Sequence, residues 1–168
     1  MARSDVQVGA GGVTFNSVDL GETVGNIAVS FGLETLIHQS DQSTMPEEVF
    51  RTGEGIVVTC PLDESSLTQL QYAFPHGTYS VSSTKKQIMV GGSTKYRFSS
   101  YAYELLIEPI NATNDNENIT VYNAVSSQPI EISLSRTAAR IWTVVFLGLK
   151  LATRDAGEQL YCIGDDSI

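Results

Sequence analysis

Apolar and polar residues alternate with a period of two over much of this chain, which is the pattern of β-strands with one buried face. The longest run covers residues 27–37, where Val29 and Phe31 alternate with small or polar residues and apolar residues continue to Ile37. The parity of the alternation slips once near Gly32. Because glycine has no side chain to pack and tolerates unusual backbone angles, we expect a bulge or bend there, within a half-buried strand.

A polar, acidic segment follows from His38 to Glu48, and a short return strand is predicted at residues 49–52. The whole excursion, residues 38–51, is predicted to be a long polar loop or hairpin between strong strands. Residues 55–62 (GIVVTCPL) then form a second apolar strand. Loops as long as this excursion are usually functional or disordered in compact domains, so we expect it to contact a partner.

The period then changes to that of a helix, because Leu67 and Leu70 recur at helical spacing. We predict one short α-helix over residues 65–72. Its N-terminal cap is expected to be Asp63 or Ser65, since side-chain oxygens of these residue types accept hydrogen bonds from the first N–H groups of a helix.

The rest of the chain is a series of short strands separated by turn residues, with a hairpin loop at residues 91–94. In the last long strand Val145, Leu147, Leu149 and Leu151 share one face. The pattern predicts an all-β fold, an antiparallel sandwich or barrel with one short α-helix, in a single domain of residues 1–168 that includes an N-terminal arm (1–12) and an acidic C-terminal tail (153–168). These further strands are expected at residues 13–15, 78–82, 87–90, 96–100, 101–110, 119–125, 130–134, 141–151 and 160–163.

The charge of the chain argues against nonspecific nucleic-acid binding. Ten basic and nineteen acidic residues give a net charge of −9, whereas DNA affinity comes mainly from neutralising phosphates. Acidic residues gather between Asp41 and Glu64, and basic residues gather at Lys85, Lys86, Lys95 and Arg97. These zones suit either self-association of oppositely charged patches or ordinary solvated faces.

No catalytic, cofactor or metal-binding constellation is recognisable, so we expect the protein not to be an enzyme and to need no cofactor. His38 and His76 lack spaced metal-ligand partners, and Cys60 and Cys162 have no redox or metal spacing. Cys60 lies in an apolar strand and is expected to be buried. The first ten residues lack the apolar core of a secretion signal, and no apolar run reaches the length of a membrane span, so no membrane association is expected.

Four stretches of the sequence carry a resemblance to a known family. They are VDLG at residues 18–21, DQSTMPEEVFRTGE at 41–54, PLDESSLTQL at 61–70 and TVVFLGLKLATRDAGEQLYCIGD from Thr143. In this order, among strands, they resemble the major tail protein, or tail tube protein, of long-tailed bacteriophages. That family is related to the ring proteins of the type VI secretion needle.

The resemblance implies a structural virion protein that is assembled in the bacterial cytoplasm. Subunits would form hexameric rings stacked into a tube, through which DNA passes at ejection without specific binding; sheath, tape-measure, baseplate and tail-terminator proteins would be further partners. The arm and the tail would lie on neighbouring subunits, and the helix would pack outside the sheets. The excursion would reach the next ring, with contacts expected from Asp41, Met45, Pro46, Glu47, Glu48, Phe50 and Arg51.

The alternative is a β-sandwich binding module that recognises carbohydrate or a host surface. Tyr101, Tyr103 and Tyr122, with the polar Asn/Thr loops, could supply such a site. Aromatic residues at alternating strand positions more often face a core or an interface. Assembly state separates the two interpretations, because only the first requires rings or tubes.

Overall fold

The computed structural model describes residues 11–41, 45–63, 66–91, 97–110, 114–134 and 140–167. These residues form an antiparallel all-β fold with one short α-helix, which confirms the predicted fold class. Nine strands make one sheet, in the order β2 (Val18–Asp19), β1 (Gly11–Phe15), β7 (Tyr103–Pro109), β8 (Ile119–Ser126), β10 (Ile141–Gly148), β4 (Glu48–Asp63) and β3 (Ala28–His38). In addition, β11 (Tyr161–Ile163) pairs with β8, and β9 (Glu131–Ser133) pairs with β10. Two further strands form a separate small sheet.

The first layer of the fold is built around β8 (Ile119–Ser126) and β7 (Tyr103–Pro109). β1 (Gly11–Phe15) pairs with the outer side of β7, and the two-residue β2 (Val18–Asp19) pairs with β1. β11 (Tyr161–Ile163) pairs with the first residues of β8. All of these pairings are antiparallel.

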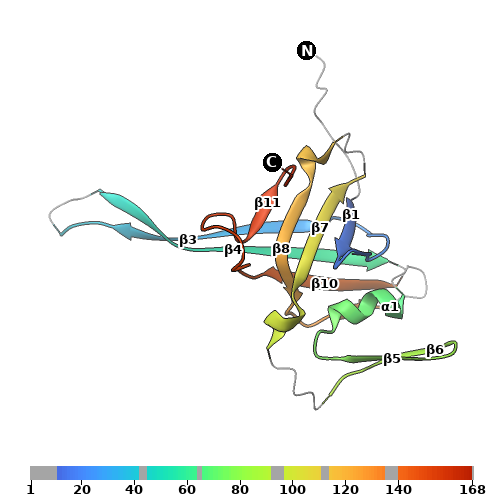
Figure 1. The fold of residues 1–168 in the computed structure, drawn as a ribbon. Coiled ribbons are helices and arrows are strands. Elements are labelled where there is room, and N and C mark those ends of the chain that lie inside the picture. The colour runs from blue at the N-terminus through green and yellow to red at the C-terminus, as the bar shows by residue number, and fades with distance from the viewer. Residues whose placement is uncertain are drawn as a thin grey trace.

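The second layer contains β10 (Ile141–Gly148), β4 (Glu48–Asp63) and β3 (Ala28–His38), with the short β9 (Glu131–Ser133) on the free side of β10. Among the described strands, the ladder of the sheet passes from one layer to the other at a corner, where residues 146–148 of β10 pair with residues 124–126 of β8. Figure 1 shows β7 and β8 running across β3, β4 and β10, as in sandwiches whose strands change sheets at a corner.

The hydrophobic core lies between these layers. β4 contributes alternate residues from Ile56 to Leu62, and β10 contributes Val144 and Phe146. Phe15 of β1 meets Phe146 across the core, with ring centroids 4.9 Å apart. Both rows of β10 are apolar, so alternation alone does not say which faces inward: the core takes Val144 and Phe146, whereas the predicted row that begins at Val145 is only partly buried.

The predicted helix is present but shorter and capped differently. α1 (Leu67–Leu70) continues as a 3₁₀ turn, η1 (Gln71–Ala73). Ser66 is the N-cap, in place of the expected Asp63 or Ser65, because Ser66 and Gln69 form a reciprocal capping box that satisfies two backbone N–H groups. Gln69 Nε2 also donates to the backbone carbonyl oxygen of Asp19 at 3.0 Å, which ties the helix to β2.

β5 (Thr78–Ser82) and β6 (Lys85–Met89) form the separate two-stranded sheet, which lies beside α1 in Figure 1. The turn between them has Ser83 at a φ of 57°, without the Asn-Gly or Asp-Gly signal that marks such turns in a sequence. Residues 98–101 form a 3₁₀ turn, η2 (Phe98–Tyr101), so the strand predicted at residues 96–100 is wrong for the residues that the structure describes. The hairpin loop predicted at residues 91–94 lies mostly outside the described residues. A third 3₁₀ turn, η3 (Asp115–Glu117), precedes β8.

Candidate interaction surface

The β3–β4 hairpin projects well beyond the rest of the protein (Figure 1). Its strands pair along the whole of β3, from Ala28 opposite Thr59 to His38 opposite Glu48. Only the inner end lies over the core: Val29 is half-buried, whereas every residue of β3 from Ser30 outward is exposed. The expectation that this run is half-buried is therefore wrong for the isolated chain, because the outer part of the hairpin has no second layer to cover it.

The register of the hairpin distributes its apolar side chains over both faces. Directly opposed residues of antiparallel strands share a face, so Leu36 with Phe50 lies on one face and Ile37 with Val49 lies on the other. The pairing shifts between Glu34 and Thr35, three positions after the predicted slip at Gly32. Gly32 itself pairs regularly, opposite Gly55.

The bulge decides which face Val49 and Phe50 occupy. Glu34 pairs with Gly53 but Thr35 pairs with Arg51, which leaves Thr52 as the extra residue of β4. One inserted residue exchanges the faces of all residues beyond it in that strand. Phe50 is thereby placed opposite Leu36, and the two form one apolar pair.

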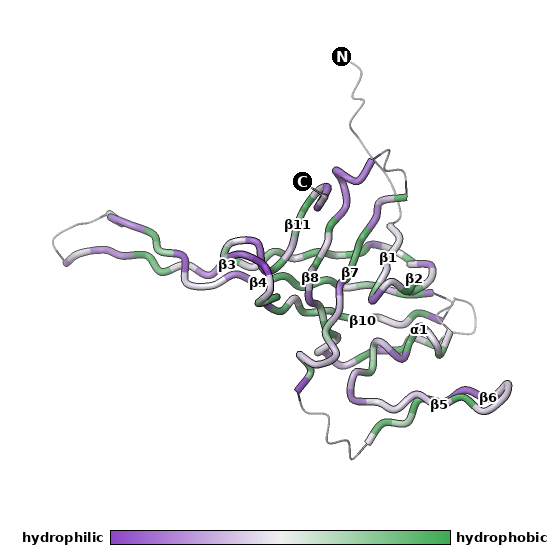
Figure 2. Tube along the Cα trace, in the orientation of Figure 1, coloured by the Kyte–Doolittle hydropathy of each residue, from purple (hydrophilic) through white to green (hydrophobic). Residues whose placement is uncertain are grey.

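These side chains are open to solvent. Large exposed apolar residues of the hairpin are Phe31, Leu33, Leu36, Ile37, Met45, Val49 and Phe50, with exposed fractions between 44 and 71%. Figure 2 shows hydrophobic segments on both strands of the projecting part. Monomeric proteins rarely expose a large contiguous apolar patch, and such a patch usually marks a site of interaction.

All seven residues that the sequence indicated as contacts lie at the outer end of this hairpin. Glu47 donates its backbone N–H to the carbonyl oxygen of His38 at 2.9 Å and accepts a hydrogen bond from Ser40 Oγ at 2.8 Å. Arg51 Nη1 forms an exposed ion pair with Glu54 Oε1 at 2.6 Å. His38 belongs to β3 and residues 48–51 belong to β4, so the connection is shorter than the predicted excursion; residues 42–44 lie outside the described part of the chain.

Sequence reasoning missed the apolar residues of the hairpin strands, above all Leu36, Ile37 and Val49. Their signal was present as two consecutive apolar pairs, Leu36–Ile37 and Val49–Phe50. Neighbours on a strand point to opposite faces, so a consecutive apolar pair places one apolar side chain on each face. That pattern indicates a strand with apolar side chains on both of its faces.

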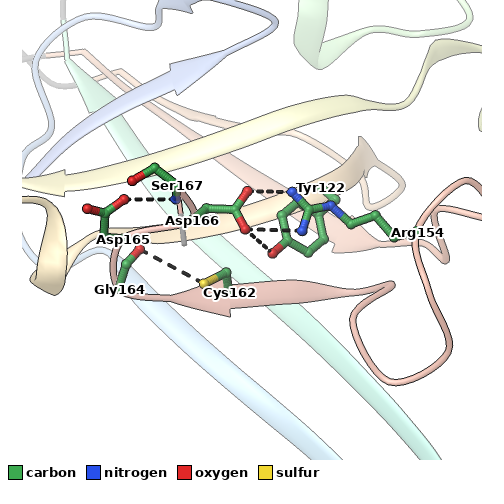
Figure 3. Close-up of polar contacts among 7 residues, drawn as sticks. All are labelled: Tyr122, Arg154, Cys162, Gly164, Asp165, Asp166 and Ser167. Carbon is green, nitrogen blue, oxygen red and sulfur yellow. Dashed lines mark hydrogen bonds and ion pairs between the residues drawn. The ribbon is translucent and has the colours of Figure 1, made fainter.

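A cluster of polar side chains links the C-terminal segment to β8 (Figure 3). Tyr122 of β8 donates its hydroxyl hydrogen to Asp166 Oδ1 at 2.8 Å, and the Arg154 guanidinium also bonds Asp166, with Nη1 3.1 Å from Oδ1. The Arg154 guanidinium lies 3.7 Å from the centroid of the Tyr122 ring, in cation–π geometry. Together with β11, this cluster places the described tail, up to Ser167, against β8 of the same chain.

The ionisation of this cluster follows from its contacts. Burial opposes the charge on Asp166, but the hydrogen bonds from Tyr122 and Arg154 outweigh it and lower the pKa of Asp166 below its ordinary value. Burial, then the hydrogen bond to Asp166, raises the pKa of Tyr122. Tyr122 is thus buried and engaged within the chain, which removes one of the three tyrosines on which the binding-module alternative rests.

Cys60 is fully buried in the core strand β4, as predicted, and burial raises the pKa of its thiol to about 12. Within the described residues, no group of His, Cys, Asp and Glu side chains could hold a metal ion. Among the described helices, none is long and apolar enough to cross a membrane.

Comparison with known proteins adds no relative: no family model and no curated protein matches this chain.

Proposed function

We propose that this protein is the structural subunit of a bacteriophage tail tube, and that its copies form rings which stack into a tube. The observation that supports this most directly is the projecting β3–β4 hairpin, which carries exposed apolar side chains on both faces; among its described residues, Phe31 still contacts the Tyr161 ring near the body of the protein, whereas the large apolar residues from Leu33 outward are exposed. A hairpin of this kind is costly in a monomer and useful in an assembly, because a neighbouring copy can cover it.

The edges of the sheet support the same proposal. β3 ends the strand order of the nine-stranded sheet, and this edge strand has exposed apolar residues on both of its faces. Exposed, apolar edge strands are a template for pairing with another chain, and closed rings of β-sheet remove such edges. The hairpin would lie against the next ring, with Asp41, Met45, Pro46, Glu47, Glu48, Phe50 and Arg51 at its outer end.

The charge of the chain suits a conduit for DNA. With a net charge of −9, a bore lined by this protein would repel phosphates and let DNA slide without binding. In this proposal the protein belongs to the virion and is assembled in the bacterial cytoplasm. Sheath, tape-measure, baseplate and tail-terminator proteins would meet the ends or the outer surface of the tube.

Light scattering after size-exclusion chromatography tests the proposal on the purified full chain. Over a rising series of protein concentrations we expect the mass to increase from the 18.2 kDa subunit to ring-sized and larger species. A single species of subunit mass at every concentration would contradict the proposal and favour an isolated binding module.

A further inference from the structure

An aromatic cavity lies between the β5–β6 sheet and the main body of the protein. It has a volume of about 330 Å³, and its wall includes Phe15, Tyr72, Phe74, Tyr79, Ile88 and Tyr103. Phe15 and Tyr103 contact each other edge to face, with ring centroids 5.9 Å apart. Neither the fold nor the tube proposal assigns this cavity a role.

One basic residue, Lys86, lies next to the lining of the cavity, and this side of the cavity is called its basic rim. Tyr79 pairs with Ile88 across β5 and β6, and the next residues on the same face are Val81 and Lys86, which pair with each other. Lys86 Nζ lies 3.1 Å from Thr68 Oγ1, which is itself 3.0 Å from the Tyr79 hydroxyl oxygen. Lys86 and the 54%-exposed Val81 are therefore the next pair on the face of the β5–β6 sheet from which Tyr79 and Ile88 line the cavity.

The outer end of the β3–β4 hairpin has the complementary chemistry. Met45 is the most exposed large apolar residue of the hairpin, at 71%, and the exposed acids Asp41, Glu47 and Glu48 surround it in sequence. A methionine thioether contacts aromatic rings favourably and adapts to irregular cavities, and acidic residues beside it match a basic rim. We propose that the cavity receives the Met45 end of the hairpin from a second copy of this chain.

The arrangement of the two surfaces makes this contact one between copies. In Figure 1 the hairpin end and the β5–β6 sheet lie at opposite ends of the protein, so the hairpin end cannot reach its own cavity. A contact between two different surfaces of identical chains is heterologous and continues from copy to copy as a ring or a filament. The inference rests on the proposed self-assembly and names the receiving site within it.

Charge reversal tests the rim. Lys86→Glu should weaken self-association about fivefold or more, since it replaces an attraction to the acidic hairpin end by repulsion. Lys85→Glu is the matched control, because Lys85 pairs with Ser82 on the opposite face of the same sheet and gives the same change in net charge. Adding Glu48→Lys to Lys86→Glu should restore association. Equal loss in both single variants, or no restoration, would overturn the contact.

Directed cross-linking tests the cavity itself. In a Cys162→Ser background, Met45→Cys protein is mixed with tagged Val81→Cys protein and oxidised with copper phenanthroline. The heterodimer, recognised by its mass, should form several-fold faster than in a mixture of Met45→Cys with tagged Ser82→Cys, whose thiol lies on the opposite face.

The outcomes separate this contact from the proposed function. Tubes or rings of the parent protein without preferential cross-linking to position 81 would overturn the contact and leave the tube subunit standing. A parent protein that stays a monomer throughout would overturn both.

Discussion

Removing the apolar pair Leu36–Phe50 should weaken assembly strongly, with little effect on folding. These side chains are 59 and 46% exposed, so about half of each remains for a partner to cover. Fully burying a large apolar side chain contributes about 1.5–3 kcal/mol, so the two exposed halves together offer about 1.5–3 kcal/mol per contact. Leu36→Ser with Phe50→Ser should therefore weaken association about ten- to a hundredfold.

The stability of the subunit should change far less. The pair lies outside the core, and a cross-strand apolar pair contributes only about 0.2–1 kcal/mol, so the free energy of unfolding should fall by less than about 1 kcal/mol. Sedimentation velocity measures association, and urea unfolding of dilute protein measures stability.

The control is a double change of exposed apolar residues elsewhere, Ile110→Ser with Ile132→Ser, which are 67 and 41% exposed. If the control weakens association as much as the hairpin variant, general surface hydrophobicity drives assembly and the hairpin has no particular role. If the hairpin variant associates like the parent, the reasoning from its exposed pair is refuted.

Three further predictions test the fold and its charges. Gly148→Ala should lower the free energy of unfolding by about 1–3 kcal/mol, because the added methyl group would overlap the Ile56 side chain. Its control, Gly55→Ala, adds a methyl group with nothing within 4 Å and should change the free energy of unfolding by less than about 1 kcal/mol. Equal values for the two variants in urea unfolding would show that the corner of the sheet at Gly148 is not closely packed. Because the pKa of Asp166 is lowered in the folded state, its ionised carboxylate stabilises the fold above the unfolded-state pKa of about 3.9, and this contribution is lost as the pH falls through the lower folded-state pKa. Asp166→Asn should therefore reduce the dependence of the free energy of unfolding on pH in this acidic range. An unchanged dependence would contradict the interaction of Asp166 with Tyr122 and Arg154. Cys60 should resist thiol reagents until the protein is unfolded, so that rapid labelling without denaturant would place β4 differently.

The strand pattern predicted the fold class because alternation records burial directly. Residues 55–62 alternate as a core strand, and the structure buries Ile56, Val58, Cys60 and Leu62 in one row. β8 and β7 were likewise predicted close to their observed bounds. Where both rows of a strand are apolar, as in β10, the pattern identifies the strand but not its inner face.

The sequence predicted only part of the candidate interaction surface. The outer residues from Asp41 to Arg51 stood out because a polar segment between strong strands is unusual. The apolar strands that flank it were interpreted as half-buried, because alternation does not say whether the covering layer belongs to the same chain. The position of the bulge at Thr52 could not be predicted from the sequence, because it is decided by the pairing of β4 with β3 and not by a glycine.

The measurement that tests the central claim most directly is electron microscopy of the purified full chain in negative stain. The account predicts rings with a hollow centre, and tubes of stacked rings at higher protein concentration, both of which Leu36→Ser with Phe50→Ser should reduce to single particles. Featureless particles of subunit size from the parent protein, under conditions where it is folded, would contradict the claim that this chain builds a tube.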